Sequence, residues 1–362
     1  MIRGEGGALG AVPMHLERLP VTPLVSVVVA NHNYGRFLQE MVESVLAQSY
    51  PHFELIVCDD GSTDDSHAVL RSLRQRDDRI VVLEKQNGGQ ASAWNTAYRH
   101  AQGAIVSLLD PDDLFLPQKL ERVVAAFQAN PKAGLIYHRW VAATAGGRVI
   151  GAPFPGDLET GWLANAALDR AALGGNTVTS VLSLRREVAN LLFPLPEAGF
   201  ERGFGDGYLQ ALAQFVTEID ALGDTLTLYR IHGDNDSGSL RPTAPGITRQ
   251  IEGRRLVYRH ARAFVAERLG HDVAAGLRLE ANAGYLEHLA ALYLLAGKPR
   301  DGVYGWRAVD LLQALPPGPR RLVWRMLFAL PARCAQATFS RWWGHAPWKR
   351  HARALTRWLR LR

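Results

Sequence analysis

The sequence predicts an α/β fold with a mostly parallel sheet flanked by helices. Three continuous apolar runs, at residues 25–29, 55–58 and 105–109, are typical of strands that are covered on both faces. Apolar residues at helical spacing lie between them, at 37–46 and 69–73. Strands that alternate with helices form crossover units, which give a parallel sheet whose ligands bind beyond the carboxyl ends of the strands.

Each apolar run ends in a polar turn at that edge. The turns are Ala30-Asn31-His32-Asn33, Asp59-Asp60-Gly61-Ser62 and Asp110-Pro111-Asp112-Asp113. Like charges repel at close range, so three carboxylates in one tight turn favour a bound cation. Mg²⁺ or Mn²⁺ is expected, because such an ion is held by one or two carboxylates together with phosphate oxygens of a substrate. The same turn is also compatible with a cap for the helix that follows Pro117.

Other features exclude several classes of protein. No Gly-x-Gly-x-x-Gly turn follows the first apolar run, which argues against a dinucleotide-binding fold. Cys58 and Cys334, the two cysteines, give no disulfide framework. Residues 1–22 lack the apolar core of a signal peptide, so we expect a flexible leader and a cytoplasmic protein.

Together the motifs resemble the family 2 glycosyltransferases, which are inverting bacterial enzymes of GT-A fold. The resemblance spans residues 24–237. It is carried by the three polar turns and by Asn87-Gly88-Gly89-Gln90 with Ala93 and Asn95, Gly205-Asp206, and Tyr229-Arg230-Ile231-His232 with Asn235 and Ser237.

The resemblance implies a nucleotide-sugar site at the polar edge of the sheet. The donor is a nucleoside-diphosphate sugar, with a UDP-sugar as first candidate. The implied donor-binding residues are Ala30, His32, Asp60, Gln90 and Asp110. The implied metal ligands are Asp112, Asp110 and His232. Turn formation by Asp59 and Asp60 with Ser62 remains an alternative, as does a structural role for His232.

Asp206 is the expected catalytic base. In the family this base is a carboxylate at the start of a helix after a Gly-rich acceptor loop, and residues 200–205 resemble that loop. The usual form has Glu directly before this Asp, whereas this chain has Gly205, which leaves Glu201 as a second candidate. An ordinary helix cap is the alternative for Asp206. The Gln/Arg-x-x-Arg-Trp element of processive members is missing, which favours transfer of one sugar per binding event.

The last 43 residues differ in charge from the rest of the chain. Residues 320–362 contain 11 Lys and Arg and no Asp or Glu, while the remainder carries 30 basic and 35 acidic residues. Five of the nine Trp residues lie there: Trp324, Trp342, Trp343, Trp348 and Trp358. A basic, Trp-rich amphipathic segment is typical of binding to an anionic membrane surface. Packing of this segment on the catalytic domain is the alternative, and no nucleic-acid-binding signature accompanies it.

The predicted organisation has four parts. They are a leader at 1–22, a GT-A domain at 23–240, a helical region of unknown task at 246–315 and a basic tail at 316–362. The expected function is metal-dependent, inverting transfer of one sugar to a saccharide or lipid-linked acceptor, in cell-surface polysaccharide or glycolipid assembly at the inner face of a bacterial plasma membrane. The alternatives are a sugar nucleotidyltransferase and a non-catalytic, membrane-docked nucleotide-sugar binding protein.

Overall fold

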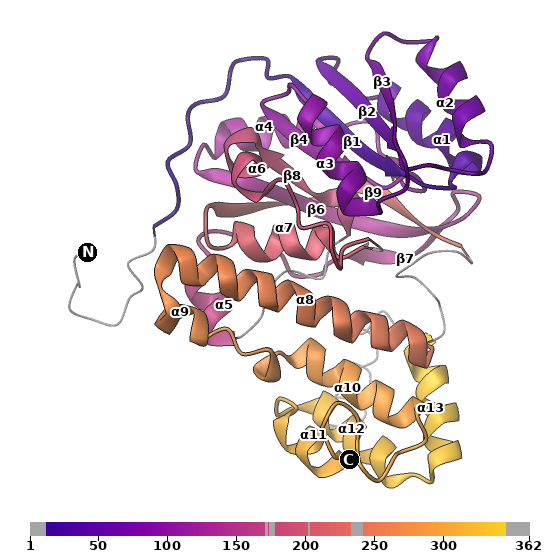
Figure 1. Ribbon diagram of the computed structural model, residues 1–362, viewed down its shortest axis with the longest axis vertical. Coiled ribbons are helices and arrows are strands. Elements are labelled where there is room, and N and C mark those ends of the chain that lie inside the picture. Colours follow the sequence, from indigo (N-terminus) through magenta and orange to yellow (C-terminus); the bar gives the residue numbers. More distant parts are fainter. Residues whose placement is uncertain (1–11, 171–172, 174–177, 202, 233–241, 345–362) are drawn as a thin grey trace.

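The structure is a computed structural model that describes residues 12–170, 173, 178–201, 203–232 and 242–344. A nine-stranded sheet with helices on both faces occupies one end of the molecule, and a set of helices that follows it in sequence occupies the other (Figure 1). The predicted α/β fold with a C-terminal helical extension is confirmed.

The sheet has a parallel half and a mixed half. Its strand order is β3-β2-β1-β4-β8-β6-β9-β5, with β7 paired to β6. The first four strands in this order are parallel, whereas β8 is antiparallel to both of its neighbours. The strands are β1 (Val25–Asn31), β2 (Phe53–Asp59), β3 (Ile80–Glu84), β4 (Ile105–Leu109), β5 (Leu114–Phe115), β6 (Ala133–Thr144), β7 (Val149–Phe154), β8 (Ser183–Arg185) and β9 (Glu218–Ile231).

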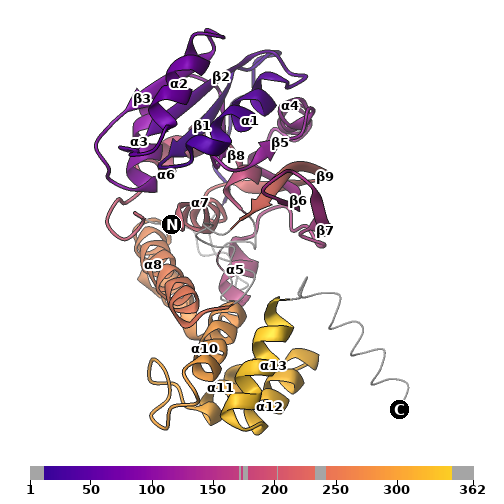
Figure 2. The same ribbon diagram turned by 90° about the vertical axis from the view of Figure 1, so that its right-hand side faces the viewer.

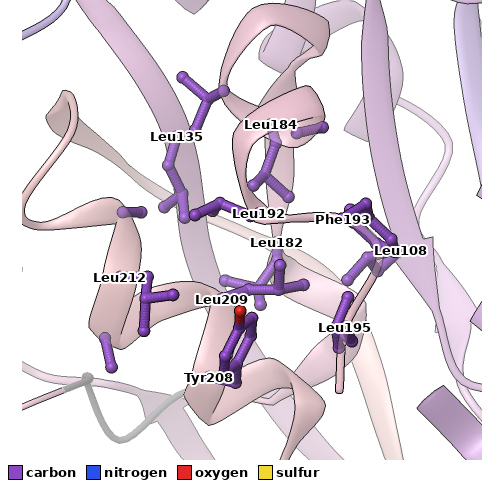
Figure 3. Close-up of a cluster of buried hydrophobic side chains, with 14 of the residues drawn as sticks. Leu108, Leu135, Leu182, Leu184, Leu192, Phe193, Leu195, Tyr208, Leu209 and Leu212 are labelled. Carbon is purple, nitrogen blue, oxygen red and sulfur yellow. The ribbon is translucent and has the colours of Figure 1, made fainter. Parts of the chain in front are cut away.

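Alternate residues of the parallel strands feed two separate cores. Val25, Val27 and Val29 of β1 pack against one set of helices, whereas Val28 faces the opposite set. The first face is covered by α1 (Gly35–Leu46), α2 (Ser66–Arg74) and α4 (Lys119–Ala129). The second is covered by α3 (Gln90–His100), α6 (Arg186–Leu192) and α7 (Gly205–Ala213). Figure 3 shows this second core, where α6 and α7 meet Leu108, Leu135 and Leu184 of the sheet.

Helix α8 (Ala244–Leu269) joins the sheet region to the helical region. The Thr243 side chain accepts a hydrogen bond from the backbone N–H of Gly246 and so caps the helix. Ala261 and Val265 lie in the second core beside α7, whereas Ile251 lies in a third core among the later helices. Figure 2 shows α8 passing below α7.

The third core corrects one expectation about the basic tail. It is built from α8, α10 (Ala283–Leu295), α11 (Ala308–Ala314), α12 (Pro319–Ala329) and α13 (Ala332–Gly344). Trp324, expected on a membrane-facing stripe, is fully buried there beside Phe339. Residues up to 344 therefore belong to the helical region, while Trp348, Trp358 and the rest of 345–362 lie outside the described residues. The remaining helices are α5 (Ala164–Arg170) and α9 (His271–Ala275).

The described part of the leader is packed against the sheet region. Leu16 is buried, and the backbone N–H of Met14 donates a 2.8 Å hydrogen bond to the carbonyl of Val216. The expectation of a flexible segment is therefore wrong for these residues, because apolar side chains of the leader find a place in the core. Within the described ranges, no helix has the length and apolar character needed to cross a membrane.

Candidate active site

A cleft of about 650 Å³ opens at the carboxyl ends of β1, β2 and β4. Its walls come from the polar turns after these strands, from the loop before α7, and from one side of α8. The lining includes Ala30, His32, Asp60, Gln90, Asp110, Asp112 and Asp206. The structure thus brings these residues, predicted from distant parts of the sequence, to one place.

The two aspartates after β2 have different surroundings. Asp59 is fully buried and binds the side chains of its neighbours: its Oδ1 accepts a 2.8 Å hydrogen bond from Asn31, and its Oδ2 lies 3.1 Å from Nε2 of His67. A carboxylate that is enclosed in this way ties the end of β1 to the end of β2. Asp59 therefore shapes the edge of the cleft and does not line it.

Asp60 lies at the cleft, but its carboxylate is occupied by protein donors. Nζ of Lys85 is 2.7 Å from Oδ1, and the backbone N–H groups of Gly88 and Gly89 donate to both oxygens at 2.6 to 3.1 Å. A carboxylate has about four acceptor positions, so these bonds use its capacity. Asp60 holds the 85–89 loop against the end of β2.

His32 and Asn87 form the adjoining part of the cleft wall. Nδ1 of His32 lies 3.1 Å from the carbonyl oxygen of Asp60, and Nδ2 of Asn87 lies 3.2 Å from the same ring nitrogen. The imidazole is exposed. These contacts orient the ring beside Ala30 without burying it, so its face and edge remain open to a ligand.

The acidic turn after β4 divides its three carboxylates between two tasks. Asp113 is fully buried, where it accepts hydrogen bonds from Oγ of Ser180 and from the backbone N–H of Arg230. Burial, with the charges of Asp112 and Asp110 nearby, raises the pKa of Asp113 well above its ordinary value. Asp113 is therefore a structural support, whereas Asp110 and Asp112 line the cleft.

Asp112 is hydrogen-bonded to His232, the residue that directly follows β9. Their Oδ2 and Nε2 atoms are 2.9 Å apart, and the imidazole also packs on the ring of Phe37 with 4.8 Å between centroids. Asp110 makes a longer contact, 3.5 Å, to Nε2 of Gln90. Asn235 and Ser237, part of the same sequence motif, lie outside the described residues.

Asp206, which also lines the cleft, lies in the first turn of α7, as the sequence predicted. Its carboxylate accepts a 2.7 Å hydrogen bond from the backbone N–H of Gly207, and burial raises its pKa above the ordinary value. Phe204, two residues earlier, has φ of 68°, in the left-handed region that non-glycine residues rarely adopt. This turn of the backbone directs the start of α7 into the cleft.

The unusual Gly205 has a steric reason. A Cβ atom at this position would lie 2.5 Å from the indole ring of Trp94, which is fully buried on α3. The Glu of the usual family pattern therefore has no room here, since the Trp94 side chain fills the space.

Glu201, the second candidate base, is exposed and differs from Asp206 in its electrostatics. Its Oε1 accepts a 2.9 Å hydrogen bond from the backbone N–H of Gly199, and such bonds lower the pKa of Glu201. Its carbonyl oxygen accepts a hydrogen bond from the backbone N–H of Gln90. Gly89, with φ of 87°, permits this approach, because a Cβ atom there would lie 2.4 Å from Cα of Glu201. A lower pKa makes Glu201 a weaker base than Asp206.

Comparison with known proteins agrees with this geometry. Residues 26–164 match the family described as Glycosyl transferase family 2. This part of the chain belongs to that family. Over 213 residues it is 34% identical to the Uncharacterized glycosyltransferase alr2836 of Nostoc sp., an alignment that covers 59% of the chain and 66% of the relative. Glycosyltransferase GlyG of Streptococcus pneumoniae is 37% identical over 109 residues, which are 30% of the chain and 36% of GlyG. The chain thus spans less than two thirds of each relative.

Two solved structures share the GT-A fold of this family member. Staphylococcus aureus TarS 1–349 superposes with a TM-score of 0.53 at 18% sequence identity, over 88% of this chain and 90% of TarS. A mannosyltransferase of Pyrobaculum calidifontis, PcManGT, solved in complex with GDP-Man and Mn²⁺, gives a TM-score of 0.50 at 20% identity. That alignment covers 92% of this chain and 90% of PcManGT. At these identities the likeness shows a common fold.

A divalent cation fits the acidic turn as a site completed by substrate. Among the described residues, no three His, Cys, Asp or Glu side chains come together as a metal cluster. Asp112 and His232 form a pair, and a pair suffices for an ion that takes its remaining ligands from water and the phosphates of a donor. The carboxylate suits both Mg²⁺ and Mn²⁺, whereas the imidazole is a ligand more typical of transition metals, so the pair suits Mn²⁺ better than Mg²⁺.

The sequence did not predict the wall of the cleft that α8 supplies. Arg249, Gln250, Arg254 and Tyr258 line it, although the segment was expected only to be helical. The signal was weak, because the apolar residues of α8 serve two cores and so mark no single face. Polar residues at 249, 250 and 254 therefore did not stand out as one surface.

Proposed function

We propose that this family 2 member transfers one sugar from a nucleoside-diphosphate sugar, a UDP-sugar as first candidate, to the hydroxyl of a saccharide or lipid-linked acceptor. Transfer inverts the anomeric centre and uses Mg²⁺ or Mn²⁺. The observation that carries the proposal is the arrangement of the cleft: it is lined both by Asp112, which is hydrogen-bonded to His232, and by Asp206, a carboxylate of raised pKa.

In the proposed reaction, Asp206 accepts the proton of the acceptor hydroxyl as its oxygen attacks the anomeric carbon. The bond between that carbon and the diphosphate breaks in the same step, and the nucleoside diphosphate leaves from the opposite face, which inverts the configuration. A raised pKa suits Asp206 to this task, because a base works best when its pKa approaches the pH of operation. A divalent cation held by Asp112 and His232 would neutralise the charge that develops on the leaving diphosphate.

We propose that the nucleotide binds at the side of the cleft where Asp60 holds the 85–89 loop. Asp60 fixes the Gly88-Gly89 backbone by hydrogen bonds, and Ala30 and His32 supply the adjoining wall. A direct hydrogen bond from a nucleobase to Asp60 would replace one of the protein bonds it now accepts. Nε2 of Gln90 lies 3.5 Å from Oδ1 of Asp110. Gln90 follows the Gly88-Gly89 backbone and Asp110 precedes Asp112, so these two residues are proposed to contact the ribose and the diphosphate.

The proposed setting is cell-surface polysaccharide or glycolipid assembly. Relatives over a third of this chain include the chondroitin synthase of Pasteurella multocida, at 33% identity. The basic C-terminal segment supports attachment to an anionic membrane surface. In its described part, Leu322 and Met326 are exposed one turn apart on α12, with Arg325 beside them, and the exposed Leu330 directly follows the helix. A basic helix with an exposed apolar row suits the interface of an anionic membrane.

The products distinguish this function from the two alternatives. The purified full chain is incubated with a panel of nucleotide sugars and Mn²⁺, with and without saccharide acceptors, and nucleoside diphosphate and pyrophosphate are measured separately. A glycosyltransferase releases nucleoside diphosphate from one donor, and an acceptor accelerates the release. A second incubation contains nucleoside triphosphates and sugar 1-phosphates, from which a nucleotidyltransferase would instead form pyrophosphate and a nucleotide sugar. Binding of a nucleotide sugar without any release would show a binding protein and overturn the proposal.

A further inference from the structure

Arg254 on α8 faces the part of the cleft that contains Asp206. Its neighbours on the helix define this position. A Cβ atom at Gly253 would lie 2.4 Å from the ring of Phe204, so this ring rests directly on the helix backbone. One turn further along α8, Val257 approaches Gly207, the residue whose N–H binds the Asp206 carboxylate. Arg254 lies between these two contacts and lines the cleft.

Packing contacts, and not hydrogen bonds, position the guanidinium of Arg254. It lies over Gly284 at the start of α10, where a Cβ atom would be only 3.2 to 3.4 Å from its carbon and terminal nitrogens. Its Nε atom is buried and has no hydrogen-bond partner. No ion pair between Arg254 and an acidic side chain occurs within the described residues, although the charge of Glu287 acts on it at longer range.

This arrangement is costly for a protein without a ligand. Arg254 is half-buried, and the buried Nε atom loses its hydrogen bonds to water without gaining one from the protein, which is unfavourable. Asp206 and Glu201 line the same cleft, but neither is paired with Arg254. Arg254 is a half-buried cation at the wall of the cleft, its Nε is buried without a hydrogen bond, and no acidic side chain within the described residues is paired with it. This arrangement indicates that its partner arrives with the substrate.

We propose that the acceptor of this enzyme is an anionic saccharide, whose carboxylate or phosphate group binds Arg254 while its hydroxyl lies at Asp206. The inference rests on the proposed function and specifies its substrate class. A guanidinium is the side chain best matched to these two anions, because its N–H groups form paired hydrogen bonds with two oxygens at once. Arg249 and Gln250, one turn earlier on α8, extend the same wall with a second cation and an amide.

The donor diphosphate is a less suitable partner for Arg254. Helix α8 packs on α7, whereas the donor edge is formed by the turns after β1, β2 and β4. In Figure 2 α8 lies below α7, away from β1 and β2. An anion bound at Arg254 is thus beside the carboxylate that takes the acceptor proton.

The test measures binding of small anions to the full chain with UDP and Mn²⁺ present at saturation, so that the donor edge is occupied. Two pairs of probes are titrated by calorimetry: methyl β-glucuronide against methyl β-glucoside, and glycerol 3-phosphate against glycerol. We expect at least one anion to bind about tenfold or more tightly than its neutral partner, the size expected for a charged hydrogen-bonded pair. The pair that shows the preference identifies the anion as carboxylate or phosphate.

Matched variants connect this preference to the residue. Arg254→Gln should abolish it, and Arg254→Lys should keep part of it. Arg255→Gln is the control, because Arg255 is the next residue on α8, is exposed, and lies 3.9 Å from Glu252 outside the cleft. Arg255→Gln should bind both pairs of probes as the wild type does. Because the readout is a ratio between two probes, a general loss of folded protein does not imitate the expected result.

Two results would overturn the proposal: equal binding of the anionic and neutral probes by the wild type, or a preference that Arg254→Gln retains. Either can occur while the wild type still releases nucleoside diphosphate from a nucleotide sugar, in which case the proposed function stands and only the acceptor class is wrong. Absence of nucleotide release together with an Arg254-dependent anion preference would instead contradict the proposed function.

Discussion

Nε2 of His232 lies 2.9 Å from Oδ2 of Asp112, and this contact joins the end of β9 to the turn after β4. The two residues are 120 positions apart in the sequence, and their side chains are 5% and 10% exposed. The imidazole rests on Phe37 of α1. The pair is therefore fixed by three separate elements of the sheet region, and one edge of the cleft depends on all of them.

Replacing Asp112 should remove the metal-dependent part of donor binding. Asp112→Asn keeps the shape but loses the charge, so turnover should fall by about 10³-fold or more, since a Lewis-acid metal contributes several kcal/mol to stabilising the leaving charge. The measurement is calorimetric binding of the nucleotide sugar with and without Mn²⁺. Asp224→Asn is the control, because Asp224 forms only a surface ion pair with Arg122. Near-native activity of Asp112→Asn would show that the turn is structural.

Asp206→Asn should lower kcat by about 10²- to 10⁴-fold and leave the Kd for the donor nearly unchanged, because a general base acts on the acceptor proton. The activity should also depend on pH. Asp206 must be ionised to work, and burial raises its pKa above the ordinary value of about 3.9. Activity is therefore lost as pH falls through this raised pKa. A pH profile of kcat/KM should show that loss in the wild type and not in the residual activity of Asp206→Asn.

Glu201→Gln provides the comparison for the base. The hydrogen bond from Gly199 lowers the pKa of Glu201, and the side chain is exposed, so this variant should keep most of its activity. Single-turnover rates with the same donor and acceptor measure both variants. A larger loss of rate in Glu201→Gln than in Asp206→Asn would identify Glu201, in the acceptor loop, as the base.

Two neighbouring glycines should respond to alanine in opposite directions. Gly205→Ala brings Cβ to 2.5 Å from the Trp94 ring and should destabilise the fold by about 1–3 kcal/mol, the usual cost of overpacking. In Gly207→Ala the new Cβ would lie at an ordinary 3.7 Å from a methyl group of Val257, and alanine favours a helix by about 0.5–1 kcal/mol over glycine. Urea unfolding followed by far-ultraviolet circular dichroism measures both. Equal stability of the two variants would contradict the role of Trp94.

How well the sequence predicts a helix or strand depends on how many different cores that element packs into. The strands at 25–29, 55–58 and 105–109 are buried on both faces, so their apolar runs are continuous and the sequence identified them. Strand β6 spans 12 residues and is only partly buried toward its end, which leaves no clear pattern. Helix α8 divides its apolar residues between two cores and hides its role at the cleft.

For the site residues, the sequence predicted their positions better than their roles. Residues at the ends of parallel strands must converge, so placing Asp60, Asp110 and Asp112 together needed only the strand pattern. Whether a carboxylate is saturated by backbone donors depends on the path of loops. That path determines that Asp60 accepts bonds from Gly88 and Gly89, and no spacing in the sequence encodes it.

Lys119 should give the wild type a stability that rises with pH. It is fully buried, with Nζ 3.2 Å from Oγ of Ser183 and 3.9 Å from the Phe115 ring centre, and burial lowers its pKa well below the ordinary value. Between that lowered pKa and about 10.4, the unfolded chain binds one more proton than the folded chain. The free energy of unfolding therefore rises with pH, by at most about 1.4 kcal/mol per pH unit.

Lys119→Met should remove this rise and be more stable than the wild type at pH 7.5. The measurement is urea unfolding at several values between pH 7.5 and 8.5. This range lies above the one in which His138 and His288, whose pKa values are lowered to about 3 by burial, act in the same direction. It also lies below the range in which the buried Cys58 thiol, whose pKa is raised to about 12, acts fully in the opposite direction. Lys132→Met is the control, because Lys132 is exposed. A wild-type stability that does not change with pH, or that changes equally in all three proteins, would show that Lys119 does not bind its proton more weakly in the folded state.

The basic C-terminal segment should bind anionic vesicles, and the third core decides where to truncate the chain. A chain that ends near residue 319 would lose Trp324, Leu327 and Phe339 from that core and would unfold the helical region. A chain that ends at 344 keeps these residues and removes six Lys and Arg together with Trp348 and Trp358. Each basic residue near an anionic surface contributes about 1 kcal/mol, so this cut should abolish most of the binding.

Co-sedimentation with vesicles that contain anionic lipid compares the two chains. The full chain should sediment at low salt and dissociate as salt is raised, because screening weakens attraction between exposed charges. The chain ending at 344 should remain in the supernatant, unfold at the same temperature, and still transfer sugar to a water-soluble acceptor, since the cleft lies wholly upstream. Equal sedimentation of both chains would place the membrane contact on the exposed face of α12, and binding by neither would mean that the acceptor reaches the cleft without a membrane.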